Sequence, residues 1–145
     1  MRSPFSTKLI VVNLAIVLMA GCGGPKLPKV TGKIMVNGAP AVGAVLLFHP
    51  VNNPDAKIAT GVAASDGTFT LMSEMKEEVQ PGNYMVSLTW PDPAHKSTEA
   101  QKLRGEVEPG ADLLKGRYVT KEKSGLSIKI EAATKELLPF ELKTK

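Results

Sequence analysis

Apolar and polar residues alternate with a period of two along most of the chain, which is the pattern of half-buried β-strands. In the first such run, Val30, Ile34 and Val36 alternate with Thr31 and Lys33. Turn residues, among them Asn-Gly and Asp-Gly pairs, separate the runs. The pattern predicts seven strands, at 30–36, 44–48, 58–63, 68–71, 84–90, 126–131 and 137–143. We therefore expect an all-β chain folded as an antiparallel sandwich.

The parity of each run indicates which side chains face the core, because neighbours in a strand point to opposite faces. Phe69 and Tyr84 are expected to be core aromatics. Trp90 shares the parity of Tyr84, so it is either a core residue or part of a binding surface. Val45 and Leu47 lie on the side of their run that faces away from the core, which indicates a strand covered on both faces.

A long hydrophilic stretch interrupts this regularity, and the segment at about 91–116 is interpreted as an insertion. A short helix is predicted at 97–103, with Ser97 or Thr98 as its N-cap. Because the seven strands already supply the apolar faces of a core, we expect the insertion to be a surface excursion and the partner-contacting region. The alternative is a structural cover for the outer side of the second strand, made by Leu103, Leu113 or Leu114.

The first residues are read as a targeting signal at 1–21 rather than as part of the fold. Arg2 and Lys8 precede a run of eleven residues at 9–19 that is apolar except for one asparagine, too short to span a membrane. The following Met-Ala-Gly-Cys resembles a bacterial lipobox, which implies cleavage before Cys22 and acylation of that cysteine. Two or three acyl chains anchor a protein stably where one does not. Residues 22–29 then form a short tether.

Composition narrows the remaining classes. The 145 residues are 43% hydrophobic and correspond to one domain, predicted at 30–145. A single cysteine excludes a disulfide framework and a zinc-finger cluster. Removing Arg2 and Lys8 with the signal lowers the formal charge from +4 to +2, and no basic cluster with interleaved aromatics indicates nucleic acid as a partner.

Four ordered motifs carry a family resemblance: Val30-x-Gly32-x-Ile34-x-Val36-Asn37-Gly38, Ser65-Asp66-Gly67-Thr68-Phe69, Pro81-Gly82-Asn83-Tyr84, and Ser124-Gly125-Leu126 followed by Phe140-Glu141-Leu142. Their order and spacing resemble those of short bacterial lipoproteins with one carboxypeptidase regulatory-like domain. The resemblance covers roughly residues 30–90 and 117–143. It implies a transthyretin-like (prealbumin-like), seven-stranded Greek-key sandwich.

The chain lacks the sequence motifs of the common enzyme classes, so we expect a protein that is not an enzyme and that uses no cofactor or metal. Two histidines, His49 and His95, are interpreted as solvated or capping residues. The turn residue Asp66 is expected to hydrogen-bond within its own turn rather than to ligate calcium. The candidate binding surface consists of Trp90, His95 and Tyr118.

These observations favour an accessory binding module that is exported and lipid-anchored to the bacterial cell membrane, on its periplasmic or outer-membrane side. Its expected partners are the membrane, through the anchor at Cys22, and an envelope protein or polysaccharide. A scaffolding lipoprotein without a ligand is the first alternative. An enzyme of unrecognised type is the second.

Overall fold

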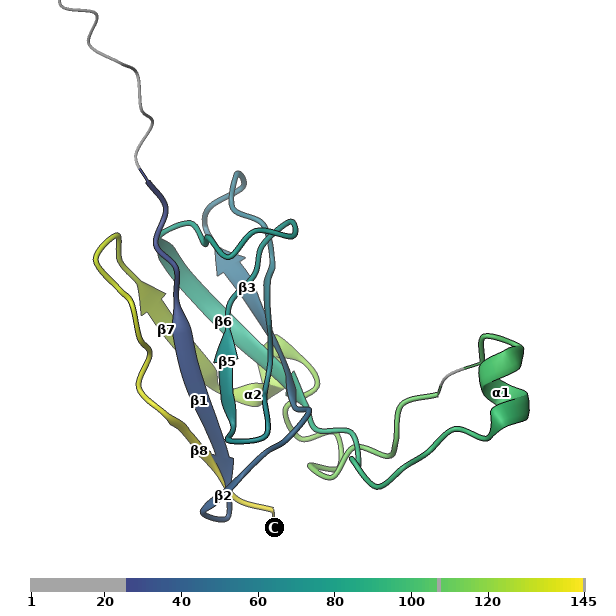
Figure 1. Cartoon of the computed structure of the whole chain (residues 1–145). Coiled ribbons are helices and arrows are strands. Elements are labelled where there is room, and N and C mark those ends of the chain that lie inside the picture. The colour runs from purple at the N-terminus through teal and green to yellow at the C-terminus, as the bar shows by residue number, and fades with distance from the viewer. Residues whose placement is uncertain (1–25, 107, 145) are drawn as a thin grey trace, which may run out of the picture.

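The computed structural model describes residues 26–106 and 108–144, so the predicted signal peptide, Cys22 and the first half of the tether lie outside it. Figure 1 shows a β-rich body with a long excursion on one side. In the described ranges, no helix has the length and apolarity that a bilayer crossing requires. The elements are β1 (Thr31–Val36), β2 (Ala39–Pro40), β3 (Val45–Val51), β4 (Ala59–Val62), β5 (Thr68–Thr70), β6 (Gly82–Thr89), α1 (Glu99–Leu103), α2 (Lys121–Ser124), β7 (Leu126–Ile130) and β8 (Phe140–Leu142).

The strands form two four-stranded sheets, which confirms the all-β prediction. In one sheet β1 lies between β5 and the pair β2 and β8, and the other has the order β4-β3-β6-β7. Neighbouring strands are antiparallel except for β8, which runs parallel to β1 with Ile34 opposite Phe140. The short strand β2 was not predicted as one; it pairs with β1 across the Asn37–Gly38 turn, where both residues have positive φ.

The second predicted strand continues further than expected. Its predicted end was Phe48, whereas β3 extends through His49 and Pro50 to Val51. β4 accompanies β3 only as far as Phe48, while β6 pairs with it along its whole length. Pro50 therefore lies where β3 is an edge strand, a position at which a sheet tolerates the missing N–H of proline.

A cluster of aromatic rings joins the two sheets. Phe48 of β3 lies 6.2 Å from both Phe69 of β5 and Phe140 of β8, measured between ring centroids, and 6.5 Å from Tyr84 of β6. All four side chains are buried, which confirms the inward prediction for Phe69 and Tyr84. The Tyr84 hydroxyl, the polar end of this cluster, donates to the carbonyl of Gln80 at 2.6 Å. The ring contacts therefore cross the core without leaving a buried donor unpaired.

Two glycines make room for the Phe69 ring of this cluster. A Cβ atom at Gly32 on β1 would lie 2.4 Å from Cζ of Phe69, and one at Gly61 on β4 would lie 2.7 Å from its Cδ2. Real Cβ contacts are not that short, so any larger residue at 32 or 61 displaces the Phe69 ring. The missing side chains on two sheets thus match one large side chain on a third strand.

We expect Phe69→Ala to lower the free energy of unfolding by about 3–5 kcal/mol, because it empties the space that the two glycines leave. Leu103→Ala is the control, since Leu103 is 88% exposed, and it should change stability by less than about 0.5 kcal/mol. Urea denaturation followed by circular dichroism measures both. Similar losses in the two variants would contradict the central place of Phe69.

Candidate binding site beside Trp90

The insertion is closed at its base by Asp112. One oxygen of this carboxylate, Oδ1, accepts hydrogen bonds from the backbone N–H groups of Trp90 (2.9 Å) and Leu114 (3.1 Å), and Oδ2 accepts one from Gly116 (2.7 Å). Backbone bonds join the same two segments, from Leu113 N–H to the Trp90 carbonyl (2.8 Å) and from Asp92 N–H to the Ala111 carbonyl (2.9 Å). The segment that leaves after β6 is therefore fastened to the segment that returns.

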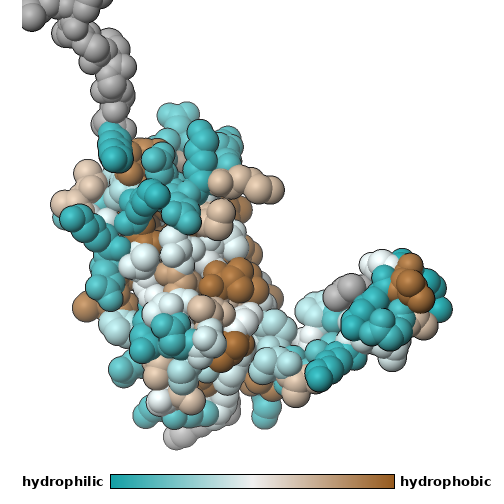
Figure 2. Space-filling view, viewed as in Figure 1, coloured by the Kyte–Doolittle hydropathy of each residue, from teal (hydrophilic) through white to brown (hydrophobic). Residues whose placement is uncertain are grey.

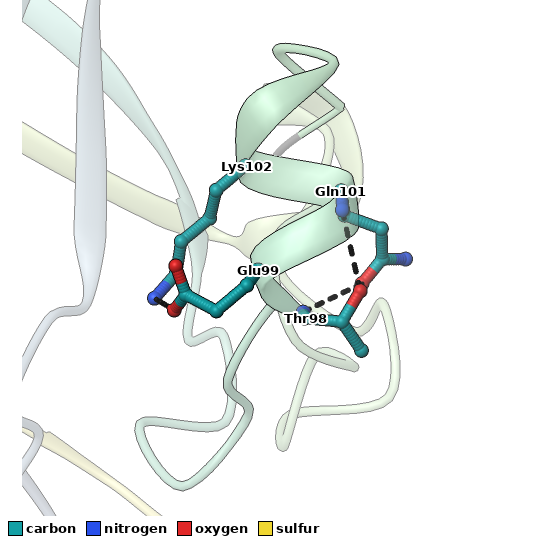
Figure 3. A network of polar contacts seen from close by, with 4 residues as sticks. All are labelled: Thr98, Glu99, Gln101 and Lys102. Carbon is teal, nitrogen blue, oxygen red and sulfur yellow. Dashed lines mark hydrogen bonds and ion pairs between the residues drawn. The ribbon is translucent and has the colours of Figure 1, made fainter.

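Beyond this base the chain forms an arm, defined as residues 93–106 and 108–110, that extends away from the sheets (Figure 1) and stands clear of the body in the space-filling view (Figure 2). Its helix α1 begins at Thr98, as the N-cap prediction proposed, and has no buried residue. The Thr98 hydroxyl accepts from the Gln101 N–H while the Gln101 side chain accepts from the Thr98 N–H, a capping box drawn in Figure 3. An ion pair joins Glu99 to Lys102 at 2.7 Å (Figure 3). Local contacts therefore hold the helix without help from the core.

The exposure of the leucines in the insertion distinguishes its two interpretations, surface excursion and structural cover. Leu103 is almost fully exposed on the arm, so the prediction that it covers the outer side of β3 is wrong. Leu114 at the base is 4% exposed and belongs to the core. The outer side of the second sheet is instead approached by α2, which packs against β6 and was not predicted as a helix. Its four residues gave no periodic signal, and its C-cap Gly125 has positive φ.

A pocket of about 430 Å³ opens beside Trp90, at the base of the arm. We call it the Trp90 pocket, and it is lined by Asn37, Trp90, Leu113, Leu114, Lys115, Arg117, Lys143 and Thr144. The Trp90 side chain is half-buried, and its indole N–H donates to the Val42 carbonyl at 3.1 Å. Trp90 thus packs against the core and lines a surface pocket at the same time.

The other two candidate surface residues do not line this pocket. Tyr118 is half-buried against the core. Its carbonyl accepts a hydrogen bond from the Leu88 N–H at 2.7 Å, which continues the pairing of β6 past the first residue of β7. His95 is exposed on the arm, close to Gly110. The structure therefore joins Trp90 to three cationic residues from distant segments rather than to Tyr118 and His95.

A second polar arrangement, on the outer side of the second sheet, was missed. His49 Nε2 lies 2.8 Å from Ser87 Oγ, because β3 and β6 pair side by side there, so the half-buried His49 has a hydrogen-bond partner on the neighbouring strand. Burial, together with the nearby positive charge of Lys121, lowers the pKa of His49 below its ordinary value of 6.5. A neutral imidazole beside a hydroxyl is a base–nucleophile pair in principle. Ser87 is only 3% exposed, however, so a substrate could not reach its hydroxyl in this conformation.

The turn residue Asp66 behaves as predicted. Its carboxylate accepts hydrogen bonds from the hydroxyl (2.6 Å) and the backbone N–H (3.0 Å) of Thr68. The hydroxyl bond, reinforced by the backbone bond, lowers the pKa of Asp66. Both of these bonds lie inside the β4–β5 turn, which gives the residue a structural role.

We expect Asp112→Ala to lower the free energy of unfolding by about 2–4 kcal/mol, since three backbone N–H groups lose a charged acceptor. Asp92→Ala is the matched control at the same base, because its side chain accepts from one exposed N–H, that of Ala94. Thermal unfolding of both variants measures the difference. Equal losses would mean that Asp112 does not fasten the base.

The lowered pKa of His49 has a definite pH consequence. The unfolded chain takes up a proton at this side chain more readily than the folded chain does, so the contribution of His49 to stability is present above pH 6.5 and declines as the pH falls below it. We expect His49→Asn to flatten the loss of stability between pH 8 and pH 5, and His95→Asn to leave it unchanged. Urea denaturation at both pH values measures the slopes; identical slopes in the two variants would contradict the assignment.

No group of three or more His, Cys, Asp or Glu side chains able to hold a metal ion gathers in residues 26–106 and 108–144. The Trp90 pocket offers an indole, an amide, a hydroxyl and cationic groups, which are suited to holding a polar ligand rather than a metal. No protein-family model, no curated protein and no solved structure matches the chain.

Proposed function

We propose that this chain is a lipid-anchored, non-catalytic module of the bacterial cell envelope that binds an envelope protein or polysaccharide at the Trp90 pocket. The observation that carries the proposal is the position of this pocket at the far end of the domain from the proposed tether. Residues 26–30 lead into β1 at one end, and Asn37, just past the other end of β1, lines the pocket. Six strand residues separate these ends by about 20 Å.

A lipid anchor at Cys22 would orient the domain, with the Trp90 pocket directed away from the lipid surface. A short tether at 22–29 holds the start of β1 near the lipid surface, and the pocket at the end of β1 is then turned toward the surroundings. The apolar run at 9–19 and the small residues before Cys22 support export and acylation. The arm extends from the same end of the sandwich as the pocket (Figure 1), so both are accessible to a partner together.

We further propose the transthyretin-like fold of carboxypeptidase regulatory-like domains for this sandwich. The support is the match between its turns and the motif order: Asn37–Gly38 after β1, Ser65–Gly67 between β4 and β5, and Pro81–Gly82 at the start of β6. The insertion then occupies the connection between β6 and β7. Relative to a seven-stranded sandwich, the short β2 is an additional strand. The last strand, β8, differs from the others in running parallel to its neighbour.

A binding role agrees better with the polar groups than a catalytic one does. The pair of His49 and Ser87 lies beside α2 on the outer side of the second sheet, with its hydroxyl buried. The Trp90 pocket holds cations and an aromatic ring but no histidine or carboxylate among its lining residues. Such a pocket can retain a ligand, whereas general acid–base chemistry relies most often on a histidine or a carboxylate within reach.

We expect Cys22→Ser to abolish acylation and to release the protein from the membrane fraction of a bacterial host. Cys22 is the only cysteine of the chain, so a labelled lipid attached to sulfur through a thioether reports on this residue alone. Gly24→Ser, two residues away, is the matched control and should remain acylated. Membrane retention of the Cys22→Ser protein, or cleavage at another residue in mass spectra, would overturn the anchoring part of the proposal.

A further inference from the structure

We propose that the Trp90 pocket recognises an acidic sugar unit, so that the partner of this protein is an anionic polysaccharide. This inference rests on the proposed binding function and specifies its ligand. It is carried by three features of the pocket, namely its charge, the engagement of its backbone donors and the placement of its indole.

The charge of the pocket comes from two segments that are far apart in the sequence. Lys115 and Arg117 belong to the returning side of the insertion, and Lys143 follows β8. Neither Lys115 nor Lys143 forms an ion pair within the part of the chain that the structure describes. The cations thus meet at one pocket, where an anion would reduce their mutual repulsion.

Asp112 and Glu141 lie on the same segments but form no ion pair with Lys115 or Lys143. Asp112 directs both oxygens to backbone N–H groups at the base of the arm. Glu141 lines an adjoining hollow with Met35 and Gly38, and it is not among the residues of the Trp90 pocket. The lining of the Trp90 pocket contains cationic, polar and apolar side chains but no acidic one.

Lys115 occupies a backbone conformation that favours glycine. Its φ is +53°, and the next residue, Gly116, has a φ of +72°. The turn buries Leu114 in the core and leaves Lys115 exposed. A lysine in this region costs free energy that glycine or asparagine would avoid, which is consistent with a side chain retained for its charge.

The backbone of the pocket wall is already occupied by internal hydrogen bonds. The N–H groups of Leu114 and Gly116 donate to the Asp112 carboxylate, that of Lys115 donates to the Asp112 carbonyl, and that of Arg117 donates to the Leu114 carbonyl. A peptide that bound by adding a strand would need free main-chain donors and acceptors. Recognition at this wall therefore depends on side chains, which favours a sugar acid over an extended peptide.

The indole of Trp90 supplies the apolar part of the site. Its N–H is held by the Val42 carbonyl, which fixes the ring on the wall of the pocket. A pyranose ring has one face of C–H groups that packs on an aromatic ring, while its carboxylate reaches a cation at the rim. Among the other lining residues, Asn37 and Thr144 exchange two hydrogen bonds, at 2.5 Å and 3.2 Å, and these hold the segment that carries Lys143.

Trp90 is the only tryptophan of the chain, so its fluorescence reports directly on this pocket. We would titrate the full-length protein, purified in detergent, with polygalacturonate, with the neutral polymer dextran and with poly-L-glutamate. Polygalacturonate should shift the Trp90 emission, with an affinity that falls as salt is raised above about 0.15 M. Dextran and poly-L-glutamate should bind at least about tenfold more weakly, a difference of about 1.4 kcal/mol.

The matched variants are two double substitutions that remove the same charge. Lys115→Gln with Lys143→Gln should weaken polygalacturonate binding at least about tenfold. Lys57→Gln with Lys76→Gln removes two lysines of a separate hollow, lined also by Asp55 and Glu74, and should change the affinity less than about twofold. Melting curves establish that both variants are folded.

Several outcomes would overturn the inference. Equal weakening in both double variants would indicate attraction by net charge alone. Equal binding of poly-L-glutamate would assign the pocket to acidic peptides, and equal binding of dextran would remove the role of charge. No binding of polygalacturonate by a protein that still retains a neutral glycan or an envelope protein would refute this ligand while the proposed binding function stands.

Discussion

The fold depends on the fit of one ring, that of Phe69, against two positions that have no side chain. Gly32 belongs to the first sheet and Gly61 to the second, and Phe69 lies within reach of both. The same ring lies 6.2 Å from Phe48 and 6.2 Å from Phe140, so it also sets the spacing of the aromatic cluster. A sandwich of this size buries only about two-thirds of its unfolded surface, and one well-filled contact between its sheets therefore stabilises both.

The sequence indicated which residues lie in the core more clearly than it indicated which strands pair. Alternation along each strand was sufficient to place Phe69 and Tyr84 in the core and to locate the turns. Pairing between distant strands was not visible in the same way. β8 runs beside β1 in parallel, and β3 continues through Pro50 because β4 has ended; both facts depend on which neighbour a strand meets. The four-residue helix α2 is too short to show a helical period.

The candidate site was predictable at its aromatic centre but not at its rim. Trp90 stood out because tryptophan is common at binding sites, where it buries a large area at a small entropic cost. Lys143 and Asn37 are 106 residues apart in the chain, and each looks like an ordinary surface residue until β8 pairs with β1. Asp112 was missed for a related reason: its partners are backbone N–H groups, which no side-chain pattern records. His95 was expected beside Trp90, whereas it is exposed on the arm and does not line the pocket.

The closed base of the arm separates evolution of the arm from that of the sandwich. Because Trp90 and Leu113 are hydrogen-bonded neighbours, the intervening chain leaves and rejoins the domain at almost one point. The free-energy cost of closing such a loop, which comes from lost chain entropy, grows by only about 0.6 kcal/mol per doubling of its length. The arm can therefore be lengthened, shortened or exchanged for another small element with little effect on the strands. The stretch between residues 93 and 110 is thus a site at which segments can be inserted or replaced while the sandwich stays unchanged.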